Sequence, residues 1–109
     1  MPAYWIARSR ILEPESYWKY AEQVPDILSR YGARVLARGG NYHIAEGSDH
    51  FNRFVLLEFP SMESAVACYE SPEYQAARKH RLPPFGDAEI VLVEGGEFTS
   101  ATSLATAAR

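Results

Sequence analysis

The segment from Phe54 to Tyr74, FVLLEFPSMESAVACYESPEY, decides the fold because a strand pattern passes directly into a helix pattern. Residues 53–59 alternate with the period of two that a strand requires, and both sides of the alternation are mostly apolar. Ser61 is placed to cap a following helix. The Ser71-Pro72 pair repeats such a start, so we expect a second helical piece after the first.

The rest of the chain predicts further strands and one more helix. Residues 3–11 and 88–94 are rich in branched and apolar side chains and read as the first and last strands. Residues 33–46 form a second extended segment, which Gly39-Gly40 interrupts. Between the first two strands, residues 14–31 carry apolar side chains at helical spacing, with a kink or break expected near Pro25.

This order of elements predicts an α+β fold, a ferredoxin-like βαββαβ sandwich with a four-stranded antiparallel sheet. The helices of such a sandwich cover one face of the sheet. The other face would expose Tyr4, Ile6, Leu36, Phe54 and Leu56, an apolar patch that is large for a monomer. We therefore expect a homodimer that buries on the order of 800 Å² on each partner.

Length and composition indicate one domain and argue against nucleic acid as a partner. The chain has 109 residues, 47% of them hydrophobic, and a net charge of -3, which argues against a nucleic-acid-binding surface. We expect a domain over residues 1–96 and a tail rich in Ala, Ser and Thr over 97–109. Phe98 and Leu104 are predicted to dock this tail on the same subunit or its partner.

Cys68 is the chain's single cysteine, which rules out an intramolecular disulfide and is compatible with a reducing compartment. We interpret it as a buried hydrophobe of the helix after Ser61 rather than a nucleophile. The N-terminus lacks a secretory signal, and no apolar run approaches the roughly 20 residues of a membrane span. The expectation is a cytoplasmic protein with no membrane partner.

Several short motifs occur in the order that a known family shows: Tyr4-Trp5-Ile6-Ala7, Ala37-Arg38-Gly39-Gly40, Glu46-Gly47, Arg53, Glu58-Phe59-Pro60-Ser61 and Ser71-Pro72-Glu73-Tyr74. Over residues 3–95 the chain resembles domain-of-unknown-function family 1330, of the dimeric α/β-barrel superfamily. The resemblance implies a dimer whose two sheets form a barrel-like body, with a cleft in or beside each sheet. Because that superfamily includes cofactor-independent monooxygenases, lactone isomerases and haem enzymes, it implies a range of functions.

Arg38 and Glu58 are the first candidate pair for a site. Strand alternation can place both on the uncovered face, beside Tyr4 and Leu56. A desolvated arginine and carboxylate there would orient an anionic or phenolic ligand. The alternative is a structural ion pair that satisfies two charges inside the dimer.

His43 is the candidate general base, since a neutral imidazole can accept a proton near neutral pH. Tyr42 or Tyr4 would then stabilise the resulting oxyanion. The alternative is a hydrogen-bonded histidine at the surface or an interface. Tyr74, Arg78 and Arg81 lie on the second helical piece, where Tyr74 and Arg78 share one face. These residues either close the mouth of the cleft or belong to a solvated helix whose tyrosine is tucked inward.

Two classes of function follow from these residues. The first is a cofactor-independent enzyme, of monooxygenase or isomerase type, that acts on a small aromatic or carbonyl compound with His43, Arg38 and Tyr4 as catalytic residues. Substrate binding is assigned to Glu58, Tyr42, Leu56, Arg53 and Tyr74. The second is a non-catalytic dimer that binds a metabolite or has a structural role. The histidine spacing matches no metal site, so neither a metal nor a cofactor is predicted.

Overall fold

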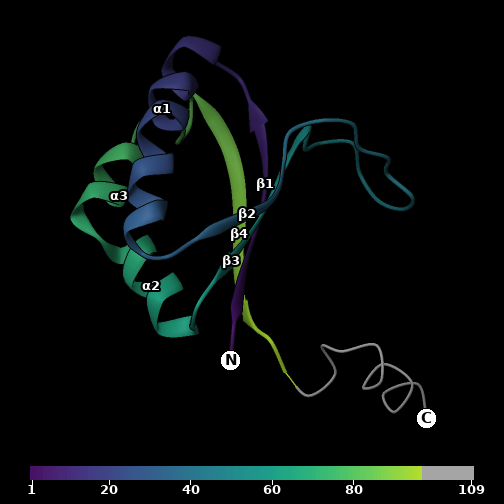
Figure 1. The fold of residues 1–109 in the computed structure, drawn as a ribbon. Coiled ribbons are helices and arrows are strands. Elements are labelled where there is room, and N and C mark those ends of the chain that lie inside the picture. The colour runs from purple at the N-terminus through teal and green to yellow at the C-terminus, as the bar shows by residue number, and fades with distance from the viewer. Residues whose placement is uncertain (97–109) are drawn as a thin grey trace.

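The computed structural model describes residues 1–96, which form four strands and three helices (Figure 1). In chain order the elements are β1 (Ala3–Ile11), α1 (Pro14–Arg30), β2 (Arg34–Arg38), β3 (Arg53–Phe59), α2 (Met62–Glu70), α3 (Pro72–Arg78) and β4 (Gly86–Glu94). The tail and the predicted docking of Phe98 and Leu104 lie outside the described residues. No helix within residues 1–96 is both long and apolar enough to cross a membrane.

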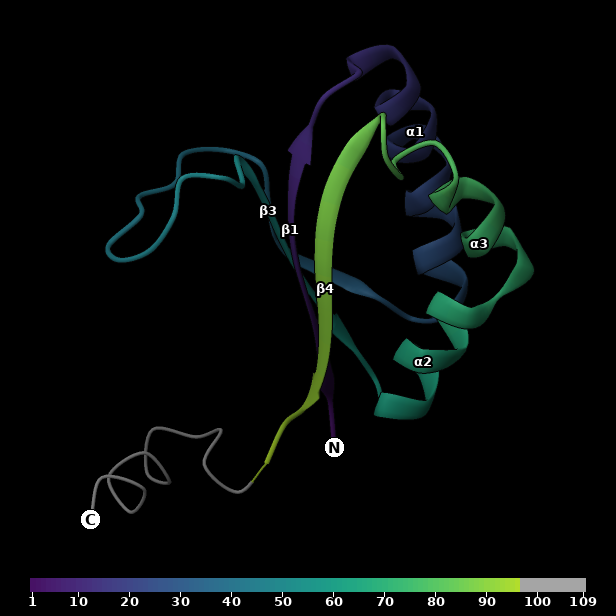
Figure 2. The ribbon, with the colours of Figure 1, turned by 180° about the vertical axis from the view of Figure 1, so that it is seen from behind.

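The strands form one antiparallel sheet in the order β2-β3-β1-β4. All three helices lie on one face of this sheet, and the opposite face is left open (Figures 1 and 2). The predicted α+β, ferredoxin-like fold is confirmed. β1 is a central strand of the sheet. It pairs with β3 on one side and, along its whole length, with β4 on the other.

The alternation of β1 separates the two faces. Ala3 and Trp5 point toward the helices and are buried, at 0% and 2% exposure. Trp5 stacks on Phe59 and meets the ring of Tyr74 edge on, with ring centroids 5.8 and 5.2 Å apart. Ile6 points the other way and remains 47% exposed. The core therefore lies between the sheet and the helices.

Two serine caps divide the second helical region as predicted. Ser61 Oγ accepts a hydrogen bond from the Ser64 backbone N–H at 3.1 Å and begins α2. Ser71 Oγ accepts one from Tyr74 at 3.2 Å and begins α3. Each side chain satisfies a backbone donor that the first turn of a helix leaves free.

Two predicted segments differ in the structure. Helix α1 runs unbroken through Pro25, so the expected break near Val24 is wrong. The second strand ends at Arg38 instead of residue 46. Gly39 and Gly40, with φ of 70° and 76°, turn the chain out of the sheet, since this backbone region favours glycine.

Residues 39–52 then form an arm that extends from the sheet on the side away from the helices (Figures 1 and 2). Nearly all of its residues are exposed. The arm carries His43, so the geometry of this segment decides where that side chain lies.

Candidate functional site

An apolar pocket lies between α1 and the helix-covered face of the sheet, with a volume of about 60 Å³. This volume is several times the roughly 10–15 Å³ that a cavity needs to admit one water. Aromatic and aliphatic side chains form most of its wall. The polar side chains that line it are Ser9, Tyr17, Tyr20, Arg38, Arg53 and Arg81.

Arg81 supplies a buried positive charge to this pocket. Its side chain is 5% exposed, and its guanidinium remains protonated at any physiological pH. Nη2 donates a hydrogen bond to the Tyr74 hydroxyl at 3.1 Å, and the guanidinium carbon lies 5.1 Å from the ring centre of Tyr20. Nε is buried and has no hydrogen-bond partner within residues 1–96.

The two tyrosines beside Arg81 do not neutralise its charge. Their hydroxyl oxygens are 2.7 Å apart, so one donates a hydrogen bond to the other. Burial raises the pKa of Tyr20 and of Tyr74 above the ordinary value for a phenol, so both remain protonated and neutral near pH 7. No carboxylate forms an ion pair with Arg81 in the described part of the chain.

A close backbone contact fixes the loop that carries Arg81. A Cβ on Gly86 would lie 2.9 Å from the Arg81 carbonyl oxygen and 3.1 Å from that of Arg10. The backbone N–H groups of Leu12 and Glu13 also donate to the Phe85 carbonyl. The connection from α3 to β4 is thus tied to the end of β1, which holds Arg81 at the inner end of the pocket.

Arg38 and Arg53 mark the outer end of the same pocket. Both also line an adjoining hollow of about 340 Å³, which contains Trp18 and Tyr42. The Arg53 guanidinium carbon lies 5.7 Å from the ring centre of Tyr17, within the range of a cation–π contact. Among the described residues neither arginine forms an ion pair. Three arginines therefore line the pocket: the buried Arg81 and the more exposed Arg38 and Arg53.

Arg38 faces the helices because the pairing of β2 with β3 is irregular. Arg34 lies opposite Glu58, and Val35 lies opposite Leu57. The next pair is Ala37 with Leu56, so β2 advances by two residues where β3 advances by one. This bulge shifts the alternation by one residue, which moves the following side chains to the other face. Arg38 consequently lies opposite Val55, a residue of the helix-covered face.

The predicted pairing of Arg38 with Glu58 on the open face is therefore wrong. Glu58 instead forms an ion pair with Arg34, with Oε2 and Nη2 2.9 Å apart. Tyr4 is opposite Glu58, and Leu56 is opposite Ile6, so both lie on the open face as expected. Arg38 lies on the other face of the sheet from Glu58, Tyr4 and Leu56, where it lines the pocket.

His43 lies on the arm, where it and Tyr42 border a hollow of about 670 Å³. Arg8 and Phe54, from the open face, line the other side of this hollow. The Tyr42 and Phe54 rings pack with centroids 4.9 Å apart. The structure does not bring the three predicted catalytic residues together, because the hollow that His43 borders is lined by neither Arg38 nor Tyr4.

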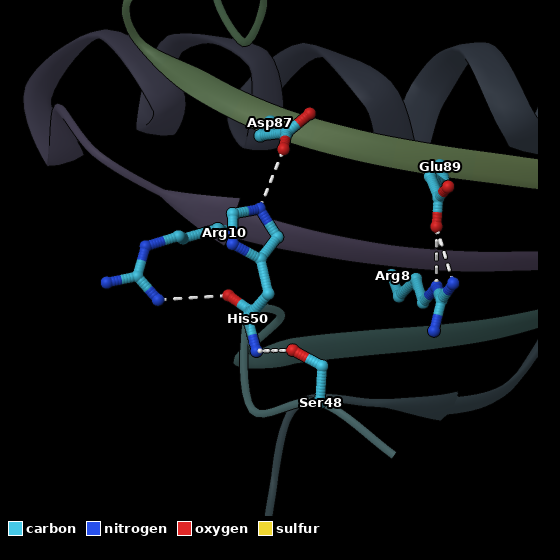
Figure 3. A network of polar contacts seen from close by, with 6 residues as sticks. All are labelled: Arg8, Arg10, Ser48, His50, Asp87 and Glu89. Atoms are coloured by element: carbon cyan, nitrogen blue, oxygen red, sulfur yellow. Dashed lines mark hydrogen bonds and ion pairs between the residues drawn. The ribbon is translucent and has the colours of Figure 1, made fainter.

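A chain of polar contacts ties the arm to the open face (Figure 3). His50 Nε2 lies 2.7 Å from Asp87 Oδ2 of β4, and Arg10 donates to the His50 carbonyl oxygen at 2.9 Å. Arg8 forms an ion pair with Glu89, 2.6 Å apart. The charged groups of these two pairs are about half exposed, so each pair contributes little to stability. The two His50 contacts join the arm to β1 and β4, whereas the Arg8–Glu89 pair lies within the sheet.

Tyr74 stands behind the pocket wall, fully buried and bonded to Tyr20 and Arg81. The tucked-inward alternative is correct for this tyrosine, whereas Arg81 is buried and not on a solvated helix. Sequence reasoning missed Ser9, Tyr17 and Tyr20. Ser9 Oγ and the Tyr17 hydroxyl are 2.9 Å apart and form a second polar spot in the pocket.

No group of three His, Cys, Asp or Glu side chains within residues 1–96 is arranged to hold a metal ion. Burial raises the pKa of the Cys68 thiol to about 11, and its side chain is fully buried in the core. Cys68 is therefore a thiol at neutral pH and cannot act as a nucleophile there.

The fold and this pocket define a class: a ferredoxin-like α+β protein with an arginine-lined pocket between its helices and its sheet. The family model for a domain of unknown function, DUF1330, matches residues 2–96. The chain belongs to this family. No curated protein sequence matches the chain.

Solved structures share the fold at low sequence identity. A protein of unknown function from Rhodopseudomonas palustris is similar with a TM-score of 0.72 and 20% identity, over 87% of this chain and 82% of that one. A dimeric, ferredoxin-like protein of unknown function from Bacteroides fragilis has a TM-score of 0.59 and 15% identity, over 86% and 96% of the two chains. SnoaB, a cofactor-independent oxygenase from Streptomyces nogalater, has a TM-score of 0.59 and 10% identity, over 87% and 93%.

Proposed function

We propose that the protein binds a small aromatic or carbonyl compound in its ionised form, with the ring between α1 and the sheet and the anionic oxygen against Arg81. The burial of the Arg81 guanidinium without a counter-ion carries this proposal. Burying a charge is costly unless it is paired. A phenolate, enolate or carboxylate oxygen of a ligand would provide the missing negative charge.

The lining of the pocket favours a ligand of this kind. Trp5, Leu28 and Leu57 supply apolar contacts for a ring, as in most small-molecule sites. Arg53 and Arg38 at the outer end attract an anion before it enters. If Tyr74 donates to Tyr20, the Tyr20 hydroxyl hydrogen is free to point into the pocket and bond the same oxygen.

The pocket lining also bears on catalysis. No Asp, Glu or His from residues 1–96 lines the pocket, so a side-chain base is not at hand there. The Arg81 charge favours the anion of a bound phenol or enol and lowers its pKa by about 1–3 units relative to the same buried position without that charge. This effect opposes the burial that raises the pKa of Tyr20 and Tyr74, and the proton that is released leaves to water. If the protein is an enzyme, we propose that it acts on this stabilised anion without a cofactor. The alternative is that it binds the metabolite without turnover.

The active form in this proposal is a homodimer in which a second copy covers the open face. Ile6, Val91 and Val93 of that face are 47%, 59% and 43% exposed in the single chain. They adjoin one another, since Ile6 pairs with Val91 across β1 and β4. Apolar surface of this extent is a feature of protein interfaces, and the Bacteroides fragilis neighbour is dimeric.

A coloured phenol tests the binding proposal. The probe is 4-methyl-2-nitrophenol, whose phenolate absorbs visible light more strongly than the neutral phenol. We expect saturable binding to the protein, with a pKa of the bound phenol about 1–3 units lower in the native protein than in Arg81→Met, because that variant lacks the buried charge.

Arg8→Met is the matched control, since Arg8 is an arginine on the opposite face that pairs with Glu89. This variant should bind the phenol and lower its pKa as the native protein does. An equal pKa of the bound phenol in the native protein and in Arg81→Met would contradict the proposal. So would an equal loss of the effect in both variants.

A further inference from the structure

A second hollow, of about 360 Å³, lies beside the pocket on the helix-covered side of the sheet, between α3 and β4. The residues that line it include Tyr69, Arg78, Arg81 and Leu82. Arg81, Ala88 and Ile90 line both this hollow and the pocket beneath α1. The two spaces are therefore neighbours, and the Arg81 side chain stands in the wall between them.

Two guanidinium groups at this hollow each have a donor atom without a partner. Arg78 Nε and Arg81 Nε are both buried without a hydrogen-bond partner among residues 1–96. Neither arginine forms an ion pair with a carboxylate in that part of the chain. The backbone N–H of Arg81 donates to the Arg78 carbonyl at 3.0 Å, so the two side chains leave the same turn. Free donors on two adjacent guanidinium groups fit the two oxygens of a carboxylate.

Asp87 is the one carboxylate that lines this hollow. Its Oδ2 is held 2.7 Å from His50 Nε2, and its side chain is 49% exposed (Figure 3). The Asp87 carboxylate is thus engaged by the arm and does not pair with Arg78 or Arg81. The buried Arg81 and the partly exposed Arg78 therefore remain available to an acid group that enters from outside.

We propose that this hollow is an acid subsite, in which Arg78 and Arg81 bind the carboxylate side arm of the ligand whose ring occupies the pocket. The inference rests on the proposed function and narrows it to one substrate class: aromatic or carbonyl compounds that carry a second, carboxylate group. Arg81 contacts both parts of such a ligand, because it lies between the two spaces. Arg78 contacts the acid group alone.

Two phenols that differ only in the acid group test this assignment. The compound 4-hydroxy-3-nitrophenylacetate has the ring of 4-methyl-2-nitrophenol, with the methyl group replaced by an acetate arm. We expect the native protein to bind the acetate about 10- to 100-fold more tightly than the methyl compound, as charge-assisted hydrogen bonds to an acid imply. Arg78→Gln should remove this preference and leave the affinity for the methyl compound unchanged.

Arg78→Lys and Arg8→Gln complete the set of variants. Arg78→Lys retains a charge without the planar fork and should keep part of the preference, and Arg8→Gln should keep all of it. Equal affinity of the native protein for the two phenols would overturn the acid subsite while the binding proposal stands. Retention of the preference in folded Arg78→Gln would also overturn it. If neither phenol binds, the proposed function falls and the subsite with it.

Discussion

Replacement of Arg81 by Met separates a ligand-binding role for this side chain from a structural one. Met has a similar length and no charge, so it can fill the volume of the Arg81 side chain beside Tyr20 and Tyr74. Because no carboxylate of residues 1–96 pairs with Arg81, the substitution leaves no opposite charge behind. The Tyr74 hydroxyl also keeps its bond to Tyr20, 2.7 Å away.

The expected change in stability is small because the gains and losses offset each other. The variant loses a hydrogen bond between a charged donor and Tyr74, about 1.5–3 kcal/mol, and cation–π contacts with two rings, about 1–2 kcal/mol. It also removes the desolvation cost of a buried guanidinium, which is several kcal/mol. We expect the free energy of unfolding to change by no more than about 1 kcal/mol.

Urea unfolding followed by tryptophan fluorescence measures this change, since Trp5 is buried in the core beside Tyr74. Protein concentration is held fixed, because the stability of a dimer depends on it. The matched control is Arg8→Met, which breaks a half-exposed ion pair with Glu89 and should cost less than about 1 kcal/mol.

A loss of about 3–5 kcal/mol in Arg81→Met would refute this reasoning, because such a loss is typical of breaking a buried ion pair. Arg81 would then be a structural residue with a partner that the argument has overlooked. Stability close to that of the native protein, together with loss of phenol binding, is the result that the proposal requires. It would show that the buried charge serves the ligand.

Three further outcomes are expected. A double-mutant cycle in urea should give a coupling of about 0.2–1 kcal/mol between Arg34 and Glu58 and none between Arg38 and Glu58, since the bulge puts Arg38 on the other face. Val91→Glu should dissociate the proposed dimer in sedimentation measurements, and a far-UV circular dichroism spectrum that stays native would show an intact fold. The raised pKa of Cys68, about 11, means that the unfolded chain ionises first as pH rises. The free energy of unfolding should therefore fall between about pH 9 and 11, by at most about 1.4 kcal/mol for each pH unit from this thiol, and a Cys68→Ala variant should show a shallower fall.

The fold was predictable because each element carries a local signal. Ser61 and Ser71 predict the starts of two helices, and in the structure each serine caps the helix that follows it. Strand alternation placed Tyr4 and Leu56 on the open face correctly. Pro25 misled the prediction because a proline lowers the stability of a helix without having to end it, and here α1 packs Val24, Ile27 and Leu28 into the core on either side of it.

The site was less predictable because it depends on the register between β2 and β3 and on the burial of Arg81. No local sequence pattern reveals either one. Alternation extended from Arg34 would place Arg38 beside Glu58, and one bulge near Leu36 reverses that result. An irregularity of one residue decides whether a guanidinium lies in a pocket or on the opposite face. Gly39-Gly40 signalled a change in direction, but the bulge precedes that pair and carries no glycine of its own.

Arg81 poses a different problem, because arginine in a segment such as KHRLPPF is usually exposed and its sequence context says nothing of burial. One signal was available: Gly86 follows closely, at a point where a side chain would strike the Arg81 carbonyl oxygen. A backbone packed that tightly holds its side chains in fixed positions, whether or not they are paired. The Arg81 guanidinium is held by the Tyr74 hydroxyl and the Tyr20 ring and not by a counter-ion of residues 1–96. A cation positioned in this way can accept an anion without rearrangement, which lowers the entropic cost of binding. The burial of Arg81 depends on tertiary packing. Local sequence therefore does not predict it, although it is what suits Arg81 to bind an anion.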